Sequence, residues 1–319
     1  MKRFFYWIGL ISALGFVAYF VNFIGKSFSW SGVAALADGR SILAILVAGC
    51  IYVLVIPFSG WAWSRLLADM GEYWHWGKTA AVIGLAQIAK YVPGNVAQHV
   101  SRAALVLSRK MPADIFAGSV LLETLLTMAA AFLMGCLGWF LARDSAFTES
   151  HVLGQTLGLA LMVLGLAVPL FAVFFRLLRH LRGRSAWIRK WVSEGLRLPG
   201  LWGICQALMA YTLNFLILGL GLFLVCAALV PAVQLDYFFL TAAFAFAWLA
   251  GFLAPGLPAG LGAREGVLSI FLAGYIPEAE LLNVLLGMRL ATVGGDILSF
   301  ALGVVLARYH LRQVEKHQA

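Results

Sequence analysis

The chain has 319 residues, of which 62% are hydrophobic and only 12% are charged. A soluble domain usually carries roughly 45–50% apolar and about 25% charged residues, so the composition excludes a soluble protein. The formal net charge is +9, but Lys and Arg lie in short connections between apolar segments and not on one amphipathic face. The basic residues therefore indicate membrane topology, and we expect no nucleic-acid partner.

Six apolar stretches are long enough to cross a bilayer, whose hydrocarbon core of about 30 Å needs roughly 20 residues of helix. No soluble domain fits between them. The predicted spans are residues 4–24, 41–60, 115–141, 157–175, 202–230 and 281–307.

Residues 78–108 form an apolar segment that is broken in the middle. Lys90 interrupts the run, and Pro93 and Gly94 follow it. A half-helix that begins after Gly94 would direct its partial positive charge to the same point as the Lys90 ammonium. Together these two features suit an anionic head group.

Two further donors follow this first break. Gln98 and Arg102 lie four residues apart and share one face if Gly94 opens a helix, so both could reach one phosphate. The alternative is a kinked helix with a solvated Arg102. The residues predicted to bind the substrate at the first break are Lys90, Tyr91, Pro93, Gly94, Gln98 and Arg102.

Residues 237–275 form a second broken segment. Its apolar run ends in Pro255-Gly256-Leu257-Pro258-Ala259-Gly260-Leu261-Gly262, and a run of about half a bilayer follows Arg264 and Glu265. The glycines permit close approach of the backbone. Arg264 then either pairs with Glu265 and holds a hairpin together or binds a ligand. The residues predicted to bind the substrate here are Gly260, Gly262 and Arg264.

The orientation follows from residues 176–197, which contain seven basic residues and the single acid Glu194. Such loops are cytoplasmic by the positive-inside rule, and counting spans places both termini on the same side. Residues 78–108 then begin and end inside, whereas residues 237–275 begin and end outside. We therefore expect an all-α polytopic membrane protein of the inner membrane, with one domain, six spans and two opposed re-entrant helical hairpins that resemble an inverted repeat.

Helix breaks at membrane depth leave backbone groups without partners, which costs several kcal/mol for each group in lipid. The breaks should therefore line a cavity. An ionisable side chain at mid-membrane costs roughly 2.5–3.5 kcal/mol and should face the interior and pair, although a residue near the interface can extend to water instead. For Glu123 we expect pairing with Lys90, Arg102 or Arg264. The predicted charge network comprises Glu123, Glu265, Asp296 and Arg289, together with Arg264.

Signatures of catalysis are weak. His75, His99 and His151 are not at metal-ligand spacing, and the sequence contains neither a Gly-x-Ser-x-Gly elbow nor a phosphate-binding loop. We therefore predict that the protein is not an enzyme and uses no metal or other cofactor.

Three motifs occur in a specific order along the chain. They are Lys90-Tyr91-Val92-Pro93-Gly94 followed by Arg102, then Leu122-Glu123, and then Pro258-Ala259-Gly260-Leu261-Gly262-Ala263-Arg264-Glu265-Gly266. This set resembles the lysylphosphatidylglycerol synthase transmembrane-region family, also described as flippase-like, over nearly the whole chain. Where that family often has Pro-Gly-Gly-Leu-Gly, this sequence has Ala259 at the second position.

The resemblance implies a membrane bundle with re-entrant helices that moves a lipid between leaflets. Bifunctional members also carry a cytoplasmic aminoacyl transferase domain, whereas this sequence ends at Ala319 after a short tail. It therefore resembles a stand-alone flippase domain that would not make the aminoacylated lipid. Members are linked to aminoacyl phospholipids, polyprenyl-phosphate sugars and hopanoid-type lipids, so the resemblance does not name the cargo.

The sequence thus predicts a lipid transporter for an anionic phospholipid or a polyprenyl-phosphate lipid, in which Lys90, Gln98 and Arg102 contact the phosphate. The internal charge network would carry a coupling proton. Two alternatives are a membrane-embedded transferase acting on a lipid-linked sugar and a non-transporting scaffold that binds envelope-lipid biosynthetic enzymes through its basic loop.

Overall fold

The computed structural model describes residues 34–91, 97–141, 199–254 and 258–310. Within these ranges all regular secondary structure is helical, which confirms the predicted all-α class. The elements are α3 (Gly39–Tyr52), α4 (Val55–Asp69), α5 (Trp76–Ala86), η1 (Gln87–Tyr91), α6 (Ala97–Leu107), α7 (Ala113–Leu141), α10 (Leu201–Leu229), α11 (Tyr237–Leu253), η3 (Pro258–Gly260), α12 (Ala263–Leu272) and α13 (Glu278–His310).

Four helical stretches are long and apolar enough to cross a membrane: Gly39–Asp69, Ala113–Gly138, Leu201–Leu229 and Glu280–His310. They coincide with the predicted spans at 41–60, 115–141, 202–230 and 281–307, so the protein is a helical membrane protein. The predicted spans 4–24 and 157–175 and the basic loop 176–197 lie outside the described residues.

The first of these stretches bends between α3 and α4 and continues to Asp69, beyond the predicted end at Gly60. Pro57 explains the bend, because it has no N–H and its ring clashes with the carbonyl four residues earlier, that of Val53. The Val53 carbonyl instead accepts from the Ile56 amide three residues further along the chain, at 3.0 Å. The two sides of this bend carry Tyr52 and Ser59, which line the same internal cavity.

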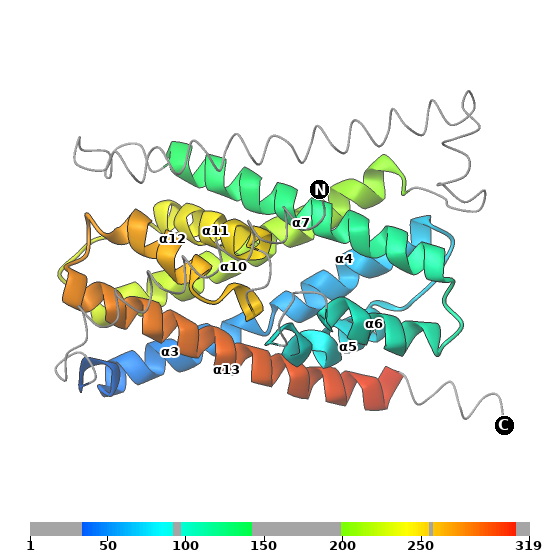
Figure 1. Cartoon of the computed structure of the whole chain (residues 1–319), viewed down its shortest axis with the longest axis horizontal. Coiled ribbons are helices and arrows are strands. Elements are labelled where there is room, and N and C mark those ends of the chain that lie inside the picture. Colours follow the sequence, from blue (N-terminus) through cyan, green and yellow to red (C-terminus); the bar gives the residue numbers. More distant parts are fainter. Residues whose placement is uncertain (1–33, 92–96, 142–198, 255–257, 311–319) are drawn as a thin grey trace, which may run out of the picture.

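The helices lie mostly along the long axis of the described bundle (Figure 1). Both broken segments adopt a helix-break-helix form, in which α5 contacts α6 and α11 contacts α12. The α5–η1–α6 unit runs from one end of the bundle to its middle and back, and the α11–η3–α12 unit does the same from the other end (Figure 1). The two breaks meet, because η1 contacts η3.

Small residues allow the central helices to approach closely. Gly84 of α5 lies so near Gly303 of α13 that a Cβ atom on Gly84 would be 2.8 Å from the Gly303 Cα atom. Such contacts are typical of membrane helices, where packing of small residues replaces the hydrophobic drive between helices. This crossing holds α5 against α13 and so fixes the position of η1, which follows α5.

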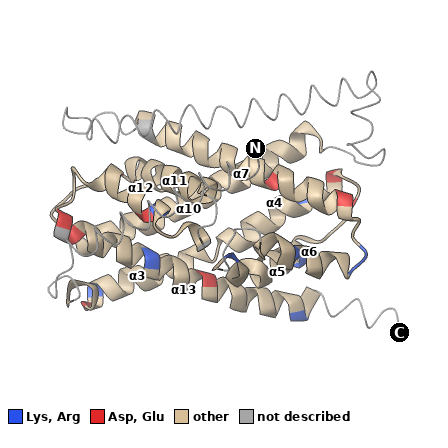
Figure 2. Cartoon of the chain, viewed as in Figure 1, with Lys and Arg blue, Asp and Glu red and all other residues tan. Residues whose placement is uncertain are grey.

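Charged side chains are sparse on the described helices and gather mainly at the two ends of the bundle (Figure 2). A few lie in the middle of the bundle (Figure 2), and at such a depth in a bilayer a charge needs a partner or a polar cavity. These central charges belong to the two breaks and to the helices that face them.

Candidate substrate cavity between the two breaks

A cavity of about 200 Å³ lies between the two helix-break-helix units. Both breaks contribute to its wall, as does the α7 and α10 side of the bundle. This agrees with the expectation that non-helical backbone at membrane depth borders a cavity. The predicted residues that line the cavity are Lys90, Gln98, Arg102, Glu123, Gly260 and Arg264.

Asp296 of α13 organises the polar contacts of the first break. Its carboxylate accepts a hydrogen bond and forms an ion pair with Lys90, whose Nζ lies 2.6 Å from Asp296 Oδ1. Gln87 donates to the same oxygen at 2.9 Å, and Tyr91 donates its hydroxyl proton to the other. Lys90 and Gln87 also donate to the hydroxyl of Tyr52. Asp296 therefore anchors η1 to α13.

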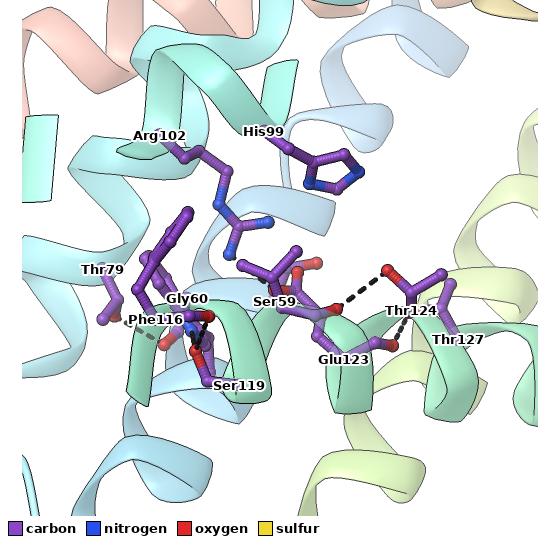
Figure 3. A network of polar contacts seen from close by, with 12 residues as sticks. Ser59, Gly60, Thr79, His99, Arg102, Phe116, Ser119, Glu123, Thr124 and Thr127 are labelled. Carbon is purple, nitrogen blue, oxygen red and sulfur yellow. Dashed lines mark hydrogen bonds and ion pairs between the residues drawn. The ribbon is translucent and has the colours of Figure 1, made fainter. Parts of the chain in front are cut away.

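Arg102 forms the second ion pair of the cavity. Its Nη2 lies 2.5 Å from Oε2 of Glu123 on α7, so Arg102 is the partner of Glu123 among the three cations expected. The guanidinium also lies 4.1 Å from the ring centroid of Trp63, which itself donates to Ser119 at 3.0 Å. Only 6% of Arg102 is exposed, so the alternative of a solvated Arg102 is wrong. Figure 3 shows Arg102 and His99 extending from α6 towards the part of α7 that carries Ser119, Glu123, Thr124 and Thr127.

The third ion pair ties the second break to α13. Arg289 Nη1 lies 3.2 Å from Glu265 Oε1, and the other oxygen of Glu265 accepts the Gly262 amide at 2.8 Å. Glu265 thereby caps the start of α12. Arg264 and Glu265 were the alternative pair that would hold the hairpin together, and this alternative is wrong. Glu265 pairs with Arg289 of α13, whereas Arg264 lines the cavity.

The chain turns sharply in the second break. Ala259, Gly260 and Gly262 have φ values of 51°, 68° and 83°, in the left-handed region that glycine adopts without steric cost. Gly260 also lies against Gly251 of α11, and a Cβ atom on Gly260 would be 3.0 Å from the Gly251 Cα atom. This contact fixes η3 against α11 and places Arg264 beside the cavity.

Arg264 differs from the other cations of the cavity. No hydrogen bond or ion pair joins it to another residue in the part of the chain that the structure describes, and its buried Nε atom is without a partner there. Lys90 and Arg102 are neutralised by Asp296 and Glu123. If His99 is neutral, three cations face two anions, so the cavity carries one excess positive charge.

Several other buried polar atoms also lack partners among the described residues. With Arg264 included, seven described residues have such an atom, and five of them line the cavity: His99, Arg102, Tyr211, Asn214 and Arg264. Buried polar groups are nearly always hydrogen-bonded to protein, water or a ligand. The concentration of free donors and acceptors in one place makes this cavity the candidate site for a polar molecule.

The remaining predicted residues support the cavity from outside or cannot be placed. Tyr91, Asp296, Glu265, Arg289 and Gly262 hold the breaks and do not line the cavity. The expected single charge network is therefore three separate ion pairs. Pro93 and Gly94 lie outside the described residues. In the described ranges no three His, Cys, Asp or Glu side chains come together as a possible metal site.

Sequence reasoning missed several residues of the cavity wall. They are single polar or aromatic side chains within apolar helices, namely Tyr52, Ser59, Gln87, His99, Thr124, Thr127, Tyr211 and Asn214. A signal was present for the last two, because Tyr211 and Asn214 lie three residues apart within a 29-residue apolar helix. A buried amide in such a helix needs a partner, and this requirement alone could have marked that face of α10.

The fold and the cavity define a polytopic helical membrane protein with two broken helical units around a polar, positively charged interior. The chain belongs to the family of the lysylphosphatidylglycerol synthase transmembrane region, whose sequence pattern matches residues 6–303. This match confirms the resemblance seen in the three motifs and makes the protein a member of a membrane-associated, lipid-related family. No curated protein matches the chain.

Proposed function

We propose that the protein is a lipid transporter that moves a lipid with an anionic head group between the leaflets of the inner membrane. The observation that carries this proposal is Arg264, an unpaired guanidinium at the wall of a cavity between two helix breaks. A phosphate is the lipid group that best satisfies such a cation, because guanidinium and phosphate form paired, charge-assisted hydrogen bonds.

The cost of a buried charge supports the same conclusion. An arginine in a low-dielectric region without a counter-ion destabilises the protein, and such residues in membrane proteins mark substrate or ion pathways. A scaffold would gain nothing from this arrangement, since a well-packed apolar core would be more stable. A site that binds a phosphate transiently needs a cation that no internal carboxylate already neutralises.

The arrangement of the breaks supports transport across the whole bilayer. We infer that the α5–η1–α6 unit is a re-entrant hairpin that enters from the cytoplasm, and that the α11–η3–α12 unit enters from the opposite face. Two such hairpins would form an inverted repeat whose breaks meet near the midplane, a design that offers one site to both sides in turn. With the basic loop 176–197 inside, both termini are cytoplasmic.

Leaflet exchange in proteoliposomes tests the proposal. The wild-type protein should accelerate exchange of an acyl-labelled anionic phospholipid, measured by dithionite quenching of the outer leaflet. Arg264→Gln should abolish the acceleration. Arg65→Gln is the matched control, because Arg65 donates to Gln206 at 3.0 Å and does not line the cavity. If wild-type and protein-free liposomes exchange lipid at the same rate, the proposal is wrong.

A second measurement identifies the natural lipid. Lipids that co-purify in mild detergent should include a phosphate-bearing species that the wild-type protein retains and Arg264→Gln loses. Arg65→Gln should retain it. Equal retention by the wild-type protein and Arg264→Gln would place the phosphate elsewhere.

A further inference from the structure

Resting on this proposed function, we propose that the transported head group is a phosphodiester bearing neutral hydroxyl groups, and that Tyr211 and Asn214 of α10 bind those hydroxyls. The substrate class is thus a lipid with a polyol or sugar head group. Arg264 would hold the phosphate of the same molecule.

Tyr211 and Asn214 are deeply buried uncharged residues of the cavity wall, and each carries a polar atom without a partner. Tyr211 is 2% exposed and Asn214 is 6% exposed, and both line the cavity. They lie three residues apart on α10 and so occupy one face of that helix. The Tyr211 hydroxyl and Asn214 Oδ1 have no hydrogen-bond partner within the described part of the chain. A buried polar atom without a partner costs free energy, and apolar residues at these two positions would avoid that cost. The pair therefore indicates a polar ligand.

A hydroxyl is the ligand group that suits both residues. Asn214 is oriented by Ser59, whose Oγ accepts from Asn214 Nδ2 at 3.0 Å, which leaves the amide oxygen free to accept. In the flipped orientation Ser59 would donate to the oxygen and the amide nitrogen would be free to donate. A hydroxyl both donates and accepts, so it satisfies either orientation and the Tyr211 hydroxyl as well. An ammonium group only donates and satisfies fewer of these atoms.

The charges of the cavity also exclude a cationic head group. Among the described residues, the cavity wall contains one carboxylate, that of Glu123, which is already paired with Arg102. Asp296 lies behind the wall and is paired with Lys90. An ammonium group would therefore find no free counter-ion. The single excess positive charge matches one phosphodiester, which carries one negative charge, and the rest of the head group should be neutral.

Two labelled lipids of equal charge and size test this inference. Phosphatidylglycerol and phosphatidylpropanol both carry one phosphodiester and a three-carbon head, but only the first has hydroxyls. Wild-type protein should exchange phosphatidylglycerol about tenfold faster, the effect of one hydrogen bond to a buried partner. Tyr211→Phe and Asn214→Leu should bring this ratio towards one. Equal wild-type rates for the two lipids would overturn the inference and leave the proposed function intact.

The remaining outcomes are also distinct. Exchange of neither lipid would overturn the proposed function together with the inference. An unchanged ratio in both variants would remove Tyr211 and Asn214 from the site. Labelled phosphatidylethanolamine, which carries an ammonium group, should be exchanged no faster than phosphatidylpropanol, and a rate equal to that of phosphatidylglycerol would contradict a neutral head group.

A matched hydroxyl deletion separates binding from folding. Tyr237→Phe removes a hydroxyl that donates to the Leu216 carbonyl at 2.8 Å and does not line the cavity, so the lipid ratio should stay at its wild-type value. If Asn214→Leu aggregates, Tyr211→Phe still tests the role of this face of α10, because it removes only the hydroxyl group.

Competition by an unlabelled polyprenyl-phosphate hexose distinguishes the two sources of a hydroxylated phosphodiester. Inhibition of exchange indicates a polyprenyl carrier, and the absence of inhibition indicates a glycerophospholipid.

Discussion

The ammonium of Lys90 lies 2.6 Å from the carboxylate of Asp296, although 206 residues separate the two along the chain. The contact joins η1, the break of the first unit, to the middle of α13. The Asp296 side chain is 2% exposed, so removal of either partner leaves a buried charge without its counter-ion. This contact therefore determines whether the first break keeps its position.

Removing one partner of this pair should destabilise the protein more than removing both. Lys90→Met and Asp296→Leu should each lower the free energy of unfolding by about 3–5 kcal/mol, because a lone buried charge remains. The double variant should recover much of that loss, since two apolar side chains can pack together. Thermal unfolding in detergent, followed by tryptophan fluorescence, measures all three. Additive losses in the double variant would show that the two residues act independently.

Replacement of Arg102 by lysine should preserve only part of the stability and of the lipid exchange. Arg102→Lys keeps a charge for Glu123 but loses the flat contact with Trp63, a cation–π interaction of about 1–2 kcal/mol in a desolvated site. We expect a moderate loss of stability and partial lipid exchange. Arg102→Met should abolish exchange, and the double variant Arg102→Met/Glu123→Gln should restore stability without restoring exchange. Full exchange by the double variant would show that Arg102 is purely structural.

The second break should respond in opposite ways to changes at adjacent positions. Ala259→Gly should stabilise the protein by up to about 1 kcal/mol, because a left-handed residue with a Cβ atom is strained by roughly 1–2 kcal/mol and glycine loses more entropy on folding. Gly260→Ala should destabilise it by more than that, since its Cβ atom would press on the backbone of Gly251. Midpoints of thermal unfolding compare the two variants, and a stabilised Gly260→Ala would contradict the described turn.

Single cysteines should report the two faces of the membrane. We expect Lys78→Cys and Ser108→Cys to react with an impermeant thiol reagent from the cytoplasmic side, and Val233→Cys and Tyr275→Cys from the other side. The four native cysteines are replaced first, because Cys50 and Cys205 are exposed. Labelling of positions 78 and 108 from opposite faces would mean that the segment spans the bilayer and is not re-entrant.

The breaks were predictable because their causes are local. Pro93 and Gly94, like the run from Pro255 to Gly262, interrupt apolar segments with residues that cannot continue a helix, and the charges beside them need an interior partner. The four described spans follow from length and apolar composition in the same way. None of these inferences depends on knowing which helices are neighbours.

Partners across the bundle were not predictable, because they depend on the rotation and depth of each helix. Glu123 had three candidate cations of similar merit, and only the packing of α6 on α7 selects Arg102. Likewise Glu265 is adjacent to Arg264 in sequence but pairs with Arg289, since neighbouring residues on a helix point in different directions. The bend that brings Tyr52 to Lys90 also requires the three-dimensional path of α3.

Arg289 and Asp296 lie seven residues apart on one unbroken helix, α13, a rise of about 10 Å. The first holds the unit that enters the bundle from one end, and the second holds the unit that enters from the other. A shift of α13 along its axis would therefore draw one break outwards while it pushes the other inwards. We expect the two sides of the cavity to open in alternation and never together, because a single rigid rod connects them.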